Sequence, residues 1–129
     1  MKLATLAAGL ILSAGMAAAQ NAEVIGTWKT QPDDNGNYGT VEIAPCGNAY
    51  CGVLTASFNG AGQAITSEHT GKRILWDMVP NGGGEYSGGK IYAPDRDRTY
   101  NSKMSLAGNN LSVSGCVLGI CRSQAWTRQ

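Results

Sequence analysis

Four cysteines in two matching pairs constrain this chain more than any other feature of its sequence. Cys46 and Cys51 stand five positions apart, and Cys116 and Cys121 repeat that spacing near the C-terminal end. Four cysteines allow three disulfide connectivities. We favour the local one, because the residues inside each pair, GNAY and VLGI, are typical of a turn. Cysteines that flank a hairpin turn lie within disulfide reach across the ladder, so the pattern predicts two disulfide-closed hairpins.

Long-range bridges between the two pairs are the alternative connectivities. Such a bridge would stabilise the fold by about 4 kcal/mol or more, against about 2 kcal/mol for each local bridge. We still favour the local bridges, because a turn guarantees their geometry. Zinc binding is disfavoured, because the spacing lies at the edge of the range for zinc ligands and no histidine or acidic residue lies beside the cysteines.

The start of the chain has the pattern of a secretory signal peptide at residues 1–19. Lys2 is followed by an apolar stretch at residues 3–16 and by the small-residue cleavage site AAA at residues 17–19. The stretch is too short for a membrane span, which needs roughly 20 residues. We therefore expect cleavage, a single domain at residues 20–129, and a periplasmic or secreted location. Such oxidising compartments favour disulfides.

The charge of the chain argues against several classes of partner. Without Lys2 the ten basic residues become nine and equal the nine acidic ones, so the exported chain is close to neutral. No run or stripe of Lys and Arg is present. Because phosphate binding depends on clustered positive charge, we expect neither nucleic acid nor an anionic membrane surface as a partner. We also expect no membrane insertion after the leader is removed.

Short alternating segments separated by turn residues follow the leader. The eight candidate strands lie at residues 24–30, 40–44, 52–58, 74–79, 86–92, 99–106, 111–117 and 121–128. None of these segments has the apolar period of a helix. Short strands joined by consecutive turns predict an all-β, eight-stranded, antiparallel up-and-down barrel, because closure removes exposed sheet edges. Gly88 and Gly89 lie inside one strand and predict a bend or bulge.

Residues at the two ends of the barrel sequence predict a contact between the first and last strands. Gly26 and Trp28 lie on the first candidate strand, and Trp126 and Arg128 on the last. In a closed meander these strands are neighbours, so Trp28 can close one end of the barrel with the Arg128 guanidinium across its ring. We assign structural roles to these two residues and to Trp126. The G-x-W motif with a basic residue on the last strand resembles the lipocalin-like (calycin) barrels.

A second resemblance covers nearly the whole exported chain. Its motifs are a CG…CG hairpin, the segments GKRILWDMV and GGKI followed by Ala93 and Pro94, the pattern Y-S-KM at residues 100–104, and the ending GCVLGICRSQAWTR at residues 115–128. In these motifs the chain is similar to a bacterial family of small secreted proteins catalogued as a domain of unknown function. The resemblance implies an exported β-barrel and brings no established activity.

Aromatic side chains are the candidate ligand-binding residues, namely Trp76, Tyr86, Tyr92 and Tyr100. Small barrels with aromatic interiors can bind small molecules. An eight-stranded barrel encloses a space that side chains just fill or that holds one small ligand, and a short chain favours the packed interior. Our leading hypothesis is a non-enzymatic module of the cell envelope. It would bind a small apolar or amphipathic ligand, or a partner protein, at a barrel mouth near the polar loop at residues 59–73.

His69, the single histidine of the chain, carries the alternative hypothesis of a small hydrolase-type enzyme that uses it with a loop carboxylate. It lies in the polar loop beside Glu68, and Ser67 and Asp77 are the candidate partners for a Ser-His-Asp site. No nucleophile-elbow motif accompanies them. A third hypothesis, a biotin-binding barrel of the avidin kind, rests on G-T-W at residues 26–28 and lacks the polar residues that such a site requires.

Two charged segments are better explained as turns than as sites. Residues 33–37, DDNGN, contain calcium-ligand types, but the EF-hand spacing fails and Asp and Asn are common in hairpin turns. Residues 95–98, DRDR, alternate in charge, which is typical of an exposed turn whose opposite charges balance one another. We therefore expect no metal site and no cofactor.

Overall fold

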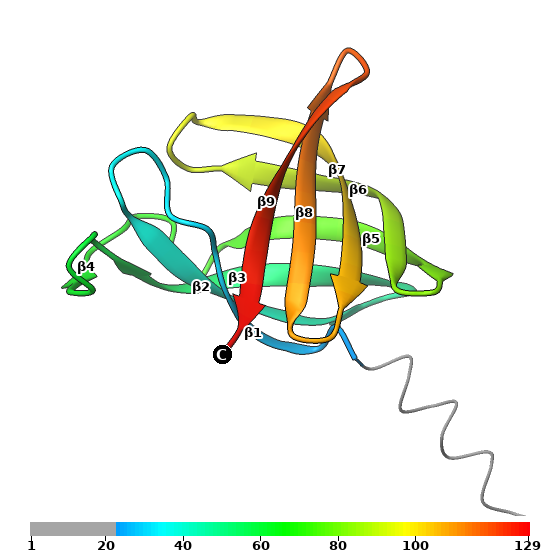
Figure 1. Cartoon of the computed structure of the whole chain (residues 1–129), viewed down its shortest axis with the longest axis horizontal. Coiled ribbons are helices and arrows are strands. Elements are labelled where there is room, and N and C mark those ends of the chain that lie inside the picture. The colour runs from blue at the N-terminus through cyan, green and yellow to red at the C-terminus, as the bar shows by residue number, and fades with distance from the viewer. Residues whose placement is uncertain (1–22) are drawn as a thin grey trace, which may run out of the picture.

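The computed structural model describes residues 23–129, which form an all-β fold without a helix (Figure 1). Within these residues no helix is long and apolar enough to cross a membrane. The predicted leader lies outside the described residues. The strands are β1 (Gly26–Lys29), β2 (Tyr38–Cys46), β3 (Ala49–Phe58), β4 (Ala64–Ile65), β5 (Arg73–Gly82), β6 (Glu85–Ala93), β7 (Arg98–Ala107), β8 (Asn110–Val117) and β9 (Ile120–Arg128).

Eight of the strands close into an antiparallel barrel, which confirms the predicted fold. Neighbours in the closed sheet follow one another along the chain apart from the short β4, and closure is completed by the pairing of β1 with both β2 and β9. β4, which the sequence analysis did not anticipate, is a two-residue strand in the polar loop that pairs with the end of β3. Alternation explains which side chains face inward: on β2, Val41 and Ile43 are buried, whereas Glu42 between them is exposed.

The two disulfides have the predicted connectivity. Cys46 is bonded to Cys51 with Cα atoms 5.6 Å apart, and Cys116 is bonded to Cys121 with Cα atoms 4.0 Å apart. The first bridge joins β2 to β3 next to their connecting turn. The second joins directly opposed residues of β8 and β9. Each bridge therefore holds the register of one hairpin.

The two glycines inside β6 form the predicted irregularity. The register between β6 and β7 shifts between Tyr86 and Gly89, and Gly88 has a φ of 77°. A Cβ atom on Gly89 would lie 2.6 Å from both the carbonyl oxygen of Trp76 and the sulfur of Met78. Glycine is therefore required twice here, once for backbone conformation and once for the close approach of β5.

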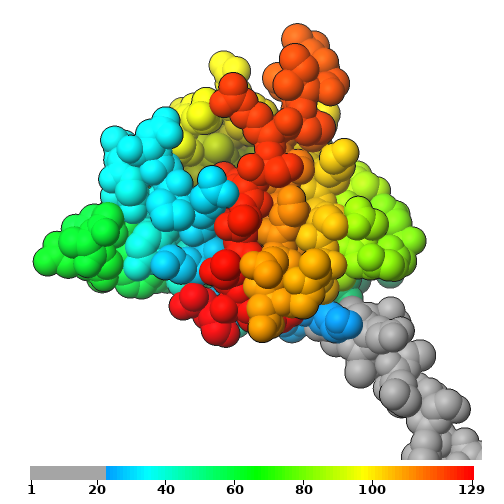
Figure 2. Space-filling model, in the orientation of Figure 1, coloured from blue at the N-terminus to red at the C-terminus, as the bar shows by residue number. Residues whose placement is uncertain are grey.

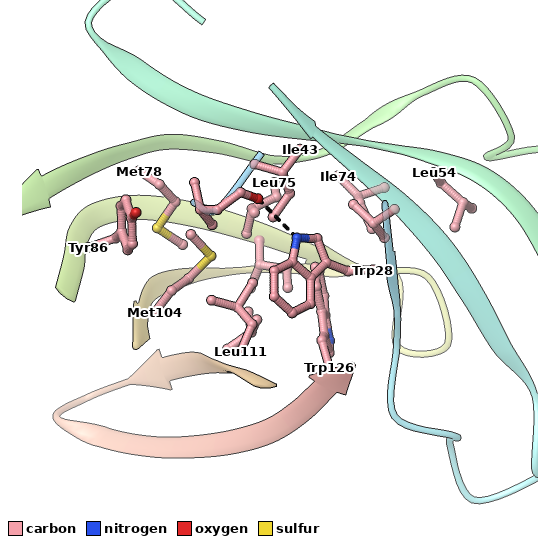
Figure 3. Packing of buried hydrophobic residues seen from close by; sticks show 14 residues of the cluster. Trp28, Ile43, Leu54, Ile74, Leu75, Met78, Tyr86, Met104, Leu111 and Trp126 are labelled. Carbon is pink, nitrogen blue, oxygen red and sulfur yellow. Dashed lines mark hydrogen bonds between the residues drawn. The ribbon is translucent and has the colours of Figure 1, made fainter. Parts of the chain in front are cut away.

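One end of the barrel interior is filled by large apolar side chains (Figure 3). Trp28 is fully buried there, and its indole Nε1 donates a hydrogen bond to the carbonyl oxygen of Val24 at 3.0 Å. Its neighbours in the core include Ile43, Leu75, Met78, Met104 and Leu111. Burial of these side chains removes large apolar groups of the described residues from water, which is the main force that stabilises the barrel.

Arg128 seals the same end from outside. Its guanidinium carbon lies 4.4 Å from the centre of the Trp28 ring. The guanidinium nitrogens donate hydrogen bonds to the backbone oxygens of Ile25 at 3.2 Å and Glu23 at 2.5 Å, and Nε donates to Asn109 Oδ1 at 3.2 Å. The last strand is thereby joined to the segment that enters the barrel and to the β7–β8 turn. This is the contact that the closed meander led us to expect.

Candidate functional site

The other end of the barrel is hollow. A cavity of about 880 Å³ opens there. Its buried apolar lining consists of Leu54, Ile74, Ile91, Val113 and Trp126. Three segments surround the hollow in Figure 2: the cyan loop after β1, the yellow β6–β7 turn and the orange-red β8–β9 hairpin. The packed interior that we expected therefore extends from Trp28 to Trp126, Leu54 and Ile74, which belong to one core cluster. The hollow lies beyond it, at the opposite end of the barrel.

The rim of the cavity is polar and carries both signs of charge. Acidic side chains come from Asp33, Asp34, Glu68 and Asp95, and basic ones from Arg96, Arg98 and Arg122. Residues 65–69 of the polar loop also line it, in the region where the sequence analysis placed the mouth. An apolar interior beneath a polar rim suits an amphipathic molecule, whose apolar part leaves water while its polar part stays hydrated.

One edge of β9 has no strand partner at residues 120–126, and we call this edge the seam. β1 pairs with β9 only at Thr127 and Arg128. In the β8–β9 ladder, hydrogen-bonded pairs alternate with non-bonded pairs. Val117 and Ile120 form the pair that closes the turn, so the backbone groups of Cys121, Ser123 and Ala125 point away from β8.

A glutamine side chain takes the place of a strand at one point of this seam. The Ala125 N–H donates to Gln31 Oε1 at 2.8 Å. Above it, Cys121 and Ser123 present a strand edge that no strand of the described chain covers. Gln31 and Ser123 both line the cavity, so the seam runs alongside it.

The structure brings two of the four predicted ligand-binding aromatics to the cavity. Tyr92 and Tyr100 line its wall. Trp76 instead lines a separate shallow hollow of about 330 Å³, together with His69, Lys72, Arg73 and Tyr92. Tyr86 lies in the packed end of the barrel, where its ring meets the Tyr50 ring edge-to-face at 5.8 Å. The packing of Tyr86 follows from its inward position beside the core, which aromatic composition alone did not reveal.

Tyr92 is fixed as a hydrogen-bond donor at the rim. Its hydroxyl donates to Asp97 Oδ1 at 2.6 Å, and its ring centre lies 5.2 Å from that of His69. The bond to Asp97, with smaller contributions from burial and from the nearby carboxylates, raises the pKa of Tyr92 above its usual value of 10.0. Tyr92 therefore stays neutral at physiological pH, and its hydroxyl is already occupied by Asp97.

His69 stands on the rim with few catalytic features around it. Its Nε2 lies 3.6 Å from Glu68 Oε1. The Ser67 hydroxyl accepts a hydrogen bond from the backbone N–H of His69 at 3.1 Å, so this contact joins Ser67 to the backbone and not to the imidazole. Asp77 is exposed on β5 and is not among the residues that line the cavity. A nucleophile-to-base hydrogen bond, the mark of a Ser-His-Asp site, is thus not among the contacts of these residues.

The acidic turn after β1 has the local geometry of a turn. Asp33 Oδ1 accepts hydrogen bonds from the backbone N–H groups of Asn35 at 2.9 Å and Asn37 at 3.0 Å. Across residues 23–129 there is no group of three or more His, Cys, Asp or Glu side chains placed to hold a metal ion. In the DRDR turn, Asp95 and Arg96 form an exposed ion pair at 4.0 Å.

Most residues that line the cavity were not among the predicted site residues. On β8, Leu111, Val113, Gly115 and Val117 alternate onto one face, and the first two are buried whereas Val117 is exposed. The inward-facing row was visible in the sequence as period-two alternation. The point along the row where packing ends and the cavity begins depends on which loops cover that end, and no local pattern encodes it.

Comparison with known proteins agrees with this architecture. The solved structure of protein HP1028 from the human pathogen Helicobacter pylori, described as belonging to the lipocalin family, matches with a TM-score of 0.67, 19% sequence identity and 83% coverage of each chain. At this identity the likeness shows a shared lipocalin-like fold. No curated protein is significantly similar in sequence. A family model described as "Uncharacterized protein conserved in bacteria (DUF2147)" matches residues 26–128, and the chain therefore belongs to the DUF2147 family.

Proposed function

We propose that this protein is a non-enzymatic binding module of the bacterial cell envelope that holds one small amphipathic molecule in its barrel cavity. The observation that carries the proposal is the cavity itself, at about 880 Å³, whose lining is apolar and polar in similar parts. Ligand sites are commonly concavities of about 300–1,000 Å³, mostly apolar, with a few placed polar groups.

The apolar part of the ligand would lie against Tyr92, Tyr100 and Val117, which line the cavity and are partly or largely exposed. The polar part would remain at the rim, within reach of Arg98 and Arg122. Because the rim carries both signs of charge, its composition favours a polar or zwitterionic group as readily as an anion.

Export is part of the proposal. The leader at residues 1–19 has the pattern of a signal peptide, which leaves residues 20–129 as one barrel domain. Two disulfides and the absence of free cysteines among the described residues are compatible with an oxidising compartment. A periplasmic or secreted protein of this kind would meet amphipathic molecules such as lipids and their breakdown products.

A substitution that fills the cavity tests the proposal. Gly115 lies on the inward row of β8 and lines the cavity, and a Cβ there would meet the Tyr100 side chain at an ordinary 3.4 Å. We expect wild-type protein to bind dansyl-undecanoic acid, a fluorescent amphiphile, and Gly115→Leu to weaken binding by roughly 10-fold or more, because the leucine takes up ligand space. Ser112→Leu, on the outward face of the same strand, is the matched control.

Titration of probe fluorescence gives the dissociation constants, and native mass spectrometry of protein purified without detergent reports any bound natural molecule. Equal binding by wild type and Gly115→Leu would place the probe elsewhere and refute the cavity as the site. Recovery of the bound molecule in hydrolysed form, with loss of that hydrolysis in His69→Ala, would favour the hydrolase hypothesis instead.

A further inference from the structure

The turn between β8 and β9 stands clear of the barrel. We call residues Val117, Leu118, Gly119 and Ile120 the hairpin tip; it is the orange-red loop at the top of Figures 1 and 2. Pairing of β8 with β7 ends at Cys116, opposite Asn101. β9 has its β1 partner only at the far end of the strand. The hairpin tip therefore has no neighbouring strand on either side.

This isolated tip is apolar. Leu118 is 97% exposed, Ile120 69% and Val117 50%. Single hydrophobic side chains scattered over a surface need no explanation. Three on one projecting four-residue turn, however, form a contiguous hydrophobic patch exposed to water. Leu118 buries almost none of its surface against the barrel, so its packing contributes little to the stability of the fold.

Leu118 is also unfavourable for the turn in which it lies. Leu118 and Gly119 have φ angles of 52° and 81°, the pattern of a two-residue hairpin turn with two left-handed positions. Asn-Gly or Asp-Gly suits such a turn, whereas a leucine strains it at the first position. Backbone strain and full exposure at one residue, with no gain to the fold, point to a contact made outside this chain.

The base of the tip is rigid. The Cys116–Cys121 disulfide crosses the ladder directly beneath Val117 and Ile120. A covalent clasp at this point holds the two strands together where no third strand supports them. The apolar side chains are thereby presented in a fixed arrangement, so little conformational entropy is lost when they bind.

The shape and surroundings of the tip indicate a membrane and not a protein as its partner. Three side chains expose on the order of a few hundred Å², whereas stable protein interfaces bury about 800 Å² per partner. Arg98 and Arg122 lie at the same end of the barrel, and neither takes part in an ion pair within residues 23–129. The rim at this end also carries acidic side chains. Charges of both signs beside exposed apolar side chains match a bilayer surface, where zwitterionic headgroups lie above hydrocarbon.

We propose that the hairpin tip inserts into the interfacial layer of a lipid bilayer and holds the barrel there with its mouth toward the membrane. Val117 and Ile120 line both the tip and the cavity, so the docked surface would be continuous with the site. Transfer of an amphipathic ligand between bilayer and cavity rests on the proposed function; docking itself does not.

The near-neutral charge of the chain does not oppose this mode of binding. The charge argument from the sequence concerned attraction of clustered lysines and arginines to anionic lipids. Insertion of leucine and isoleucine draws instead on the hydrophobic effect, which needs no net charge. Binding should accordingly depend only weakly on salt concentration.

The experiment measures co-sedimentation with vesicles of phosphatidylethanolamine and phosphatidylglycerol. We expect wild type to bind and Leu118→Asn to reduce the partition coefficient roughly 30-fold, which corresponds to about 2 kcal/mol for a leucine side chain leaving water. Asparagine fits the left-handed position better than leucine, so this variant retains the turn and its loss of binding cannot be attributed to unfolding. Val79→Thr is the matched control, because Val79 is 47% exposed on β5, away from the tip.

Absence of wild-type binding, or equal binding by wild type and Leu118→Asn, overturns the proposal. Self-association that depends on Leu118, without vesicle binding, would identify a second copy as the occupant and overturn it as well. Binding of dansyl-undecanoic acid in vesicle-free buffer separates the two hypotheses. If that probe fails to bind wild type while vesicle binding still depends on Leu118, the proposed function is wrong and membrane docking stands.

Discussion

Arg128 shows how one residue can join the two ends of a barrel. Its planar guanidinium stacks on Trp28 while donating to three acceptors on two separate segments of the chain. A lysine has no planar fork and reaches such a set of acceptors poorly. The pairing of a tryptophan on β1 with an arginine on β9 therefore depends on the shape of the arginine side chain as well as on its charge.

Replacement of this arginine should destabilise the whole barrel. We expect Arg128→Ala to lower the free energy of unfolding by about 2 kcal/mol, because a cation–π contact and several hydrogen bonds to a charged donor are lost. Arg128→Lys should recover less than half of that loss. Urea unfolding followed by tryptophan fluorescence measures both, with Arg122→Ala, exposed on the same strand, as the control that stays within about 0.5 kcal/mol of wild type.

At the scale of the element, β9 is a strand with two different edges. Its last residues pair with β8 on one side and with β1 on the other, whereas its first half pairs with β8 alone. Gln31 substitutes for a strand at Ala125. The barrel is consequently closed at the Trp28 end and split along a seam at the cavity end.

Amide hydrogen exchange should report this seam residue by residue. The N–H groups of Cys121 and Ser123 point away from β8 and should exchange roughly 100-fold faster than those of Arg122 and Gln124, which lie in hydrogen-bonded pairs. The amide of Ala125 should be protected in wild type and lose protection in Gln31→Ala. NMR-detected exchange under native conditions checks the pattern, and uniform protection along β9 would contradict an open edge.

At the scale of the whole molecule, the barrel has a packed end that determines stability and a hollow end that offers binding surfaces. The two disulfides also differ in how deeply they are buried. Cys51 is buried in the wall of the barrel, whereas Cys121 is exposed at the base of the hairpin tip. A disulfide that closes a loop of this length stabilises the fold by about 2 kcal/mol, provided that the native hairpin is equally rigid without the bridge.

Removing the two bridges should therefore have unequal effects. We expect the double substitution of Cys46 and Cys51 by serine to lower the free energy of unfolding by about 2 kcal/mol. The same change at Cys116 and Cys121 should lower it by less, because the freed tip gains native-state mobility that offsets part of the loss. Chemical denaturation of both variants provides the comparison; a larger loss at the tip bridge would mean that the tip is coupled to the core.

Local features of the sequence were enough to predict several parts of this structure. The buried face of β2, the irregularity at the glycine pair in β6 and the two local disulfides each depend on neighbours a few residues away. All three predictions are confirmed. Trp76 and Tyr86 show what local features cannot predict, namely the surroundings of a side chain in the folded barrel. Both are large aromatics on strands, yet one lines an outer hollow and the other the packed core, because their surroundings come from strands distant in sequence.

The sequence by itself determined the strands of the sheet and the two local disulfides. Strand periodicity, turn chemistry and short disulfide loops are all properties of neighbouring residues. The tertiary structure alone decided that the interior is packed at one end and open at the other, and that the VLGI turn stands free of the barrel. The physical reason is that cavity and exposure depend on how far each strand extends past its partners. That depends on the relative lengths of β1, β7, β8 and β9, and becomes definite only when the sheet closes.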